Sequence, residues 1–198
     1  MTLEPVNASG SAKLPFHQHA MLLYSNDEDK APTKYVNEGL SRGHLTIYVP
    51  INTDSNASHM SKMASGIVNY EDDVNRGNLL TLDTRSFYNF ALAGDLQPLE
   101  ELKIMLEDAI KERIAYEKND EVIVVVGIAA GLARNQKFDE SINIESWWQK
   151  THSEWLQKGL KVTIICPHSS AILDKSQFVH YKQAISSLHD ITLDPISR

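Results

Sequence analysis

Residues 122–126 read Val-Ile-Val-Val-Val, a run of five β-branched side chains without a polar residue. Such side chains favour β-strands. A strand that is apolar on both faces is typical of the interior of a parallel sheet covered by helices. Residues 162–165, Val-Thr-Ile-Ile, have a similar composition. The two runs predict two central strands of an α/β protein.

Working outward, short apolar runs alternate with stretches of helical period. The runs at 20–24, 45–49, 79–82 and 191–193 predict further strands, and helices are expected at 32–40, 96–116, 144–156 and 174–188. The helix at 96–116 has the clearest pattern, because leucines and isoleucines recur every three or four residues after a potential N-cap, Asp95. The alternation predicts a three-layer α/β fold with a mostly parallel sheet, helices on both faces and right-handed crossovers.

Composition limits the class of protein. The chain has 198 residues and a net charge of −7, which predicts one domain at 16–198 after a flexible tail at 1–15 and disfavours direct binding to nucleic acid. One cysteine allows no intrachain disulfide. The longest apolar stretch, residues 122–133, is too short for a membrane span of about 20 residues, and no export signal is recognisable. A cytoplasmic protein with no membrane partner is expected.

A nucleotide cofactor is disfavoured. Ligands of open parallel sheets bind beyond the carboxyl ends of the strands. The loop after the first predicted strand carries Asp27, Glu28 and Asp29, and no glycine occurs between Ser11 and Glu38. A phosphate cradle needs glycine backbone N–H groups and a lysine, and three carboxylates would repel phosphate. No cofactor is therefore expected.

The histidines and the cysteine suggest other chemistry. His17 and His19 have strand spacing, but no third and fourth ligand follow at fixed spacing, so no metal site is predicted. Cys166 and His168 are expected just beyond the end of their strand. A buried free cysteine usually packs as a small hydrophobic side chain. A thiol that lines a ligand pocket is favoured over a catalytic nucleophile.

Aromatic residues leave two interpretations open. Trp148 and Trp155 are seven residues apart and share a helical face, with Trp147 about 100° away. They predict core packing or the wall of an apolar pocket. Phe87, Tyr88 and Phe90 are expected either to cover the sheet or to close the mouth of such a pocket.

Several of these segments together resemble a known family. Residues 16–24 (Phe-His-Gln-His-Ala-Met-Leu-Leu-Tyr) and 35–49 resemble the opening of the MEDS domain, the DcmR-type sensory domain of methanogens and methylotrophs. Further resemblances follow in the same order at 75–83 with Tyr88 after it, at 162–166 with its terminal cysteine, and at Leu188-His189. The resemblance covers about residues 16–194, and the layout is also similar to a RecA/KaiC-like core.

The resemblance implies a degenerate P-loop-type fold that senses small molecules such as hydrocarbon derivatives, often joined to a DNA-binding or signalling module. No such module is recognisable here, which puts direct control of transcription in doubt. Ile128 also stands where the pattern suggests an acidic residue, which puts the ligand chemistry in doubt.

We therefore expect a non-enzymatic sensory or ligand-binding domain that signals through a separate effector protein and can form homo-oligomers. The ligand-binding residues are predicted to be His19, Tyr24, Asp83, Tyr88, Cys166 and His168, with apolar burial supplying affinity. One alternative is an interaction module that docks on a related KaiC/RecA-like ATPase or on itself. Another is a small hydrolase that uses Cys166.

Overall fold

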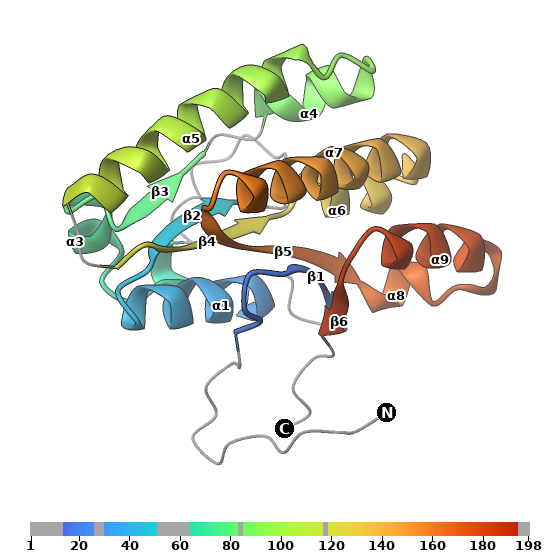
Figure 1. The fold of residues 1–198 in the computed structure, drawn as a ribbon. Helices are drawn as coiled ribbons and strands as arrows, with labels where there is room; N and C mark the ends of the chain where they lie inside the picture. Colours follow the sequence, from blue (N-terminus) through green and yellow to red (C-terminus); the bar gives the residue numbers. More distant parts are fainter. Residues whose placement is uncertain (1–13, 26–29, 51–63, 83–84, 117–118, 194–198) are drawn as a thin grey trace.

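The computed structural model describes residues 14–25, 30–50, 64–82, 85–116 and 119–193. Its centre is a six-stranded sheet with the strand order β3-β2-β4-β5-β1-β6. Every described strand pair is parallel. In the register between the central strands, Val124 of β4 lies beside Ile164 of β5. Figure 1 shows the sheet between two layers of helices.

The strands are β1 (His19–Tyr24), β2 (Leu45–Val49), β3 (Leu79–Thr81), β4 (Glu121–Val126), β5 (Lys161–Ser169) and β6 (Ile191–Leu193). The helices are α1 (Lys30–Ser41), α3 (Tyr70–Asn75), α4 (Arg85–Leu92), α5 (Gln97–Tyr116), α6 (Ile128–Arg134), α7 (Phe138–Gln157), α8 (Ser170–Leu173) and α9 (Val179–Ser187), with a 3₁₀ turn at Ser176–Phe178.

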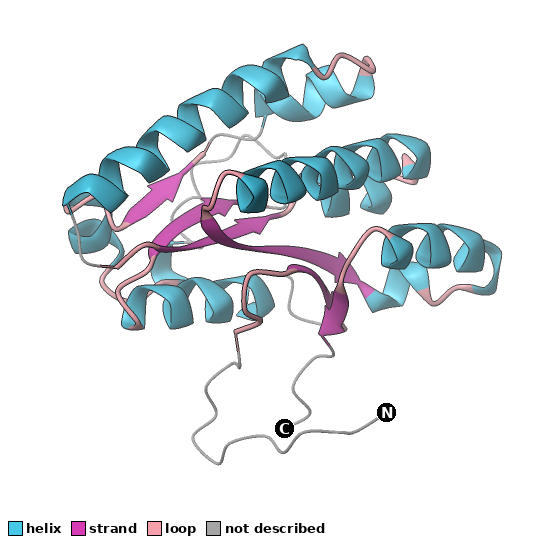
Figure 2. Ribbon diagram, in the orientation of Figure 1, coloured by secondary structure: helices cyan, strands magenta, loops and turns pink. Residues whose placement is uncertain are grey.

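The helices cover the two faces of the sheet unequally (Figure 2). One apolar core joins alternate residues of β2, β4 and β5 to α4, α5, α6 and α7. A smaller core on the opposite face includes Tyr35 and Val36 of α1. A third core packs β1 against α6, α7, α8 and α9. The predicted three-layer α/β fold is thus confirmed.

Most predicted elements are present, with instructive differences. The strand at 45–49 and the strand at 191–193 have the predicted bounds. Helix α7 begins at Phe138, six residues before the prediction, with Asp139 and Glu140 in its first turn. The expected helix at 174–188 is divided among a 3₁₀ turn and α9. Helices α4 and α6 were not predicted, because neither short segment shows a long helical period.

The most consequential difference concerns the end of β5. The prediction ended this strand at Ile165 and placed Cys166 and His168 in the loop beyond it. In the structure β5 continues to Ser169, and Pro167 pairs with Leu22 of β1. The placement beyond the strand was therefore wrong. Cys166 and His168 instead lie inside the molecule between the sheet and α7.

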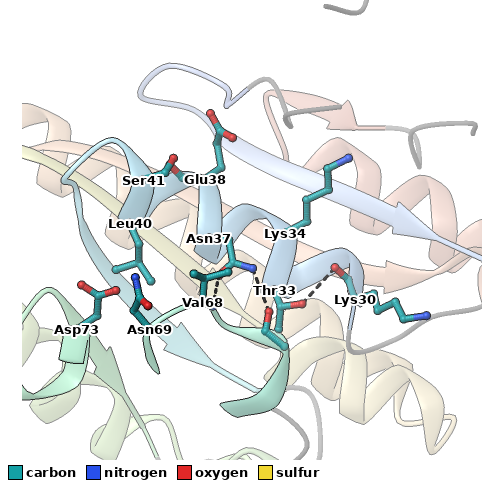
Figure 3. Close-up of a pocket in the computed structure, with 11 residues that line it drawn as sticks. Lys30, Thr33, Lys34, Asn37, Glu38, Leu40, Ser41, Val68, Asn69 and Asp73 are labelled. Carbon is teal, nitrogen blue, oxygen red and sulfur yellow. Dashed lines mark hydrogen bonds between the residues drawn. The ribbon is translucent and has the colours of Figure 1, made fainter. Parts of the chain in front are cut away.

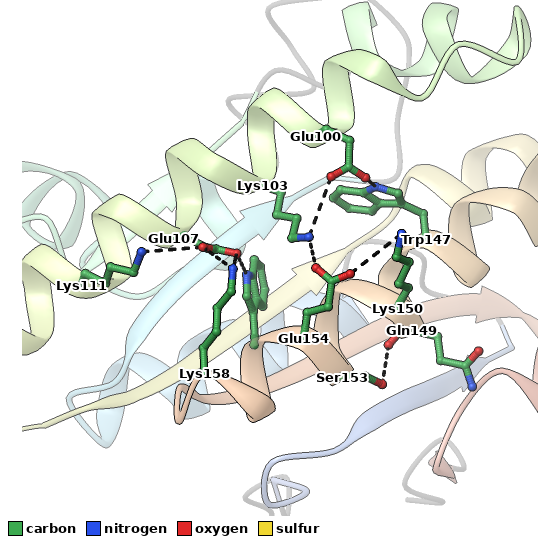
Figure 4. Close-up of polar contacts among 11 residues, drawn as sticks. Glu100, Lys103, Glu107, Lys111, Trp147, Gln149, Lys150, Ser153, Glu154 and Lys158 are labelled. Atoms are coloured by element: carbon green, nitrogen blue, oxygen red, sulfur yellow. Dashed lines mark hydrogen bonds and ion pairs between the residues drawn. The ribbon is translucent and has the colours of Figure 1, made fainter.

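Helix α7 is held against α5 by polar contacts that bridge the two helices (Figure 4). The indole N–H of Trp155 donates to Oε1 of Glu107 at 2.9 Å, and Nζ of Lys158 donates to the same carboxylate at 2.7 and 2.8 Å. The indole N–H of Trp147 donates to Glu100 at 2.7 Å. These bonds satisfy the only polar atoms of two large apolar side chains and fix the position of α7.

On the opposite face of the sheet, the backbone of α1 lies very close to the strands. A Cβ atom on Gly39 of α1 would lie 2.8 Å from both Ile123 Cδ1 and Thr46 Oγ1. The missing side chain therefore lets α1 lie directly on β2 and β4. Gly43 has φ +72° and follows the end of the helix, a position that favours glycine.

Candidate functional site

A cluster of ionisable side chains lies in the core between the sheet and helices α7 and α9. It comprises His19 of β1, Glu145 of α7, Cys166 of β5 and His189, which lies between α9 and β6. One side-chain N, O or S atom from each residue lies within 4.8 Å of the other three. We refer to these four residues as the buried cluster. The side chains of Glu145 and His189 are 0% exposed.

The register of the strands brings the cluster together. Successive side chains of a strand alternate between the two faces, so His19 points to the same face as Met21, which belongs to the core beneath α9. On β5, Cys166 points to the same face as Ile164, which packs beneath α7. Glu145 enters from α7, next to the fully buried Ile144. Three separate elements and the segment between α9 and β6 therefore each supply one residue.

The distances within the cluster are short. Nε2 of His19 lies 3.3 Å from Sγ of Cys166 and 3.6 Å from Oε2 of Glu145. Nε2 of His189 lies 3.2 Å from the same Oε2. The imidazole rings of His19 and His189 stack with their centroids 4.1 Å apart. The four groups thus face a common point.

Backbone carbonyls determine which ring nitrogen carries the proton in the two clustered histidines. Nδ1 of His19 lies 2.9 Å from the carbonyl oxygen of Leu188, and Nδ1 of His189 lies 2.8 Å from that of Ile185. A carbonyl oxygen only accepts, so both Nδ1 atoms must donate. In the neutral imidazoles both Nε2 atoms then present a lone pair to the cluster.

His168 forms a hydrogen bond with the other carboxylate oxygen of Glu145, Oε1. Its Nε2 lies 2.8 Å from Oε1 of Glu145, and an ionised carboxylate can only accept, so His168 donates. Within the described residues, Oε2 of Glu145 and Nε2 of His189 have no hydrogen bond of good geometry. Oε2 is thereby left available to a further partner in the cluster.

The electrostatics of the cluster are strongly perturbed. Burial would raise the pKa of Glu145, but the charge of His189, the hydrogen bond from His168 and the close approach of the His189 and His19 rings lower it well below its usual value. Burial lowers the pKa of His189, but the Glu145 carboxylate raises it by a larger amount. The pKa of His189 is therefore above its usual value. Burial and the same carboxylate raise the pKa of the Cys166 thiol well above its usual value.

Three of the six predicted ligand-binding residues belong to this region. His19 and Cys166 are members of the buried cluster, and His168 contacts it through Glu145. Tyr24 lies at the other end of β1 and packs with Ala130. The hydroxyl of Tyr88 on α4 accepts a hydrogen bond from Asn135 at 2.6 Å. Asp83 lies outside the described residues.

His17 and His19, which have strand spacing in the sequence, do not come together. His17 has φ +50° and its Nε2 contacts Glu121 at 2.8 Å, whereas His19 points into the core. The further members of the cluster, Glu145 and His189, were not predicted as ligands, although the resemblance included His189. A signal for Glu145 exists in the sequence, because it shares the apolar face of α7 with Trp148 and His152, at positions i, i+3 and i+7.

The three tryptophans belong to the core. Trp148 and Trp155 are fully buried and Trp147 is 5% exposed, and all three pack in the large core beneath α5 and α7. Trp147 and Trp148 meet edge to face with centroids 4.7 Å apart. Of the two interpretations that the sequence left open, the structure shows core packing.

An open pocket of about 680 Å³ lies on the other face, between α1 and residues 66–73 (Figure 3). Asn37 spans it, since its Nδ2 donates to Gly66 O and its Oδ1 accepts from the Val68 N–H, both at 2.9 Å. Its lining carries both signs of charge, with Lys34 and Glu38 among the members. Of the predicted ligand-binding residues that the structure describes, none lines this pocket.

Comparisons with known proteins add little to this picture. The chain matches no family model and no curated protein. Among solved structures it is similar to the flagellar accessory protein FlaH from Methanocaldococcus jannaschii, with 14% identity over 91% of this chain and 72% of FlaH. The TM-score of 0.44 is too low to support a conclusion about function. None of the described helices combines the length and apolar character that crossing a bilayer requires.

Proposed function

We propose that this chain is a non-enzymatic sensory domain that binds its small ligand at the buried cluster. The proposal depends mainly on one observation, the convergence of Nε2 of His189 and Oε2 of Glu145, two ionisable groups 3.2 Å apart without a hydrogen bond of good geometry, in a core that folding alone would fill with apolar side chains. Buried ionisable groups without full hydrogen bonding cost stability. Strongly perturbed groups of this kind concentrate at functional sites.

The environment of the cysteine favours binding over catalysis. A cysteine nucleophile reacts as the thiolate and needs access to its substrate. Cys166 is 0% exposed, and burial raises its pKa well above the usual value. A thiol in this setting stays protonated until a ligand takes the place of the proton.

The position of His189 suggests how binding could be communicated. His189 lies between α9 and β6, and β6 is a three-residue edge strand that pairs only with β1 among the described strands. Within α9 only Ile185 is buried. Segments with few buried contacts open most readily. A ligand bound by both His189 and the sheet would hold residues 179–193 against the sheet. Dissociation of the ligand would release these residues to bind an effector protein.

Thermal unfolding of the full chain tests the proposal with a panel of short-chain alcohols, short-chain halogenated hydrocarbons, small carboxylates and divalent cations. A specific ligand at a hundredfold excess over its Kd adds about 2.7 kcal/mol, or roughly 5–10 °C in Tm for a chain of this size. The increase should disappear in Glu145→Gln. It should persist in Glu101→Gln, a matched change at an exposed residue of α5.

Two results would overturn the proposal. One is a panel in which no class of compound raises the Tm of the wild-type chain. The other is an increase of equal size in Glu145→Gln and Glu101→Gln, because binding would then not depend on the cluster.

A further inference from the structure

We infer that the ligand of the buried cluster is a divalent transition-metal ion of the Zn²⁺ type, bound by Nε2 of His19, Nε2 of His189, Sγ of Cys166 and Oε2 of Glu145. This inference rests on the proposed function and names the ligand class of the same site. It is carried by the geometry of the four donor atoms, by the contacts behind them and by their charges.

The donor atoms already have nearly the spacing of a coordination shell. Bonds of about 2.0–2.3 Å in a tetrahedral zinc site place neighbouring donors roughly 3.3–3.8 Å apart. The observed separations are 3.3 Å for His19 Nε2 to Cys166 Sγ, 3.6 Å for His19 Nε2 to Glu145 Oε2 and 3.2 Å for His189 Nε2 to the same oxygen. No pair exceeds 4.8 Å. Small side-chain movements would complete the shell.

The contacts behind the donors are those of metal-binding histidines. A histidine ligand commonly donates its other ring N–H to a carbonyl or carboxylate, which orients the ring and directs the lone pair at the metal. His19 donates from Nδ1 to Leu188 O, and His189 donates from Nδ1 to Ile185 O. His168 plays the matching role for Glu145 by occupying Oε1 and leaving Oε2 free.

The charges at this point are also compatible with a bound cation. Without a metal ion, the lone pairs of His189 Nε2 and Glu145 Oε2 face each other at 3.2 Å unless a proton lies between them. When the metal ion binds, Cys166–SH loses its proton to solvent and forms a metal–thiolate bond, and any proton on His189 Nε2 is released in the same way. The thiolate and the carboxylate then neutralise the two positive charges of the ion.

The donor set narrows the choice of ion. Two imidazoles with one thiolate suit zinc and its neighbours, whereas Mg²⁺ and Ca²⁺ prefer shells made only of oxygen. All four donors come from the protein, which is typical of zinc sites without catalytic activity. A closed site of this kind agrees with a sensory role.

Titration of the full chain with Co²⁺ and Zn²⁺ after chelation and dialysis tests the inference. Co²⁺ should bind at about one ion per chain and give the visible absorption of tetrahedral cobalt together with a thiolate charge-transfer band in the near ultraviolet. Zn²⁺ should displace it. Cys166→Ser should lose the charge-transfer band, and His189→Gln should weaken binding at least tenfold. His180→Gln, which removes an exposed histidine of α9, should bind like the wild-type chain.

The inference fails if Co²⁺ binds at well below one ion per chain, if the charge-transfer band is missing, or if Cys166→Ser and His189→Gln bind as tightly as the wild-type chain. Far-ultraviolet circular dichroism establishes that each variant is folded, and His189→Gln lies in the peripheral α9–β6 segment, where folding is least at risk. An organic compound that stabilises the wild-type chain but not Glu145→Gln, without metal binding, would keep the proposed function and remove this inference.

Discussion

Nε2 of His189 lies 3.2 Å from Oε2 of Glu145 in the core between the sheet and α7, and each atom directs a lone pair at the other when the imidazole is neutral. This contact joins α7 to the segment between α9 and β6. It has to be completed by a proton or by a bound cation. The stability of the fold, its dependence on pH and its response to a ligand should therefore all depend on this pair of atoms.

Removal of Glu145 alone should be strongly destabilising. Glu145→Ala leaves the N–H group of His168 without its acceptor and leaves a cavity. Loss of one partner from a buried ionic group costs about 3–5 kcal/mol in the free energy of unfolding, measurable by urea denaturation at neutral pH. Glu101→Ala on the exposed face of α5 should change it by about 0.5 kcal/mol or less.

Replacement of Glu145 together with its two histidine partners by apolar residues should recover much of the lost free energy of unfolding, because no charge then remains unpaired. The combination of Glu145→Met, His168→Leu and His189→Leu should be closer to the wild-type chain in stability than Glu145→Ala. If the triple variant were less stable than Glu145→Ala, the cluster would be required for folding, and its interpretation as a ligand site would lose its main support.

The thiol of Cys166 should be almost unreactive in the native chain. Its pKa is raised well above the usual value by burial and by Glu145, and the side chain is 0% exposed. Iodoacetamide near pH 7.5 should label it at least about a hundredfold more slowly in buffer than in denaturant. Rapid labelling of the folded chain at neutral pH would instead favour the cysteine-dependent hydrolase.

Metal binding should release protons. Isothermal titration calorimetry with Zn²⁺ in two buffers of different ionisation enthalpy should give about one to two protons per ion, from the Cys166 thiol and from His189. Cys166→Ser should release about one proton fewer. Binding without proton release would show that the thiol is not a ligand.

The contact between α5 and α7 should respond to acid through Glu107. Burial would raise the pKa of Glu107, but hydrogen bonds from Lys158 and Trp155 and the charge of Lys158 lower it below its ordinary value of 4.5. Its contribution to stability is therefore complete above the unfolded-state pKa and is lost as the pH falls through the lower folded-state pKa. The stability advantage of the wild-type chain over Glu107→Gln should shrink below about pH 4.5.

Urea denaturation from about pH 7 to pH 3 measures this difference. Asp108→Asn, a change at the neighbouring exposed residue, provides the control and should show little dependence on pH. A constant difference between the wild-type chain and Glu107→Gln over this range would show that the carboxylate gains nothing from Lys158 and Trp155.

The sequence by itself determined the fold class. The run at 122–126 and the repeated leucines at 99–106 are local patterns whose period follows from backbone geometry, and both elements are present with nearly the predicted bounds. His19, Cys166 and His168 could also be selected as candidates, because polar or reactive side chains next to apolar strands are unusual.

Only the tertiary structure decided how these candidates are used. The length of β5 places Cys166 inside the sheet rather than beyond it, and the earlier start of α7 does not disturb the face that carries Glu145. His19 and His189 are 170 positions apart in the sequence and meet because β6 pairs with β1. Spacing along the chain cannot predict such contacts, since strand order and register depend on how all the helices pack against the sheet.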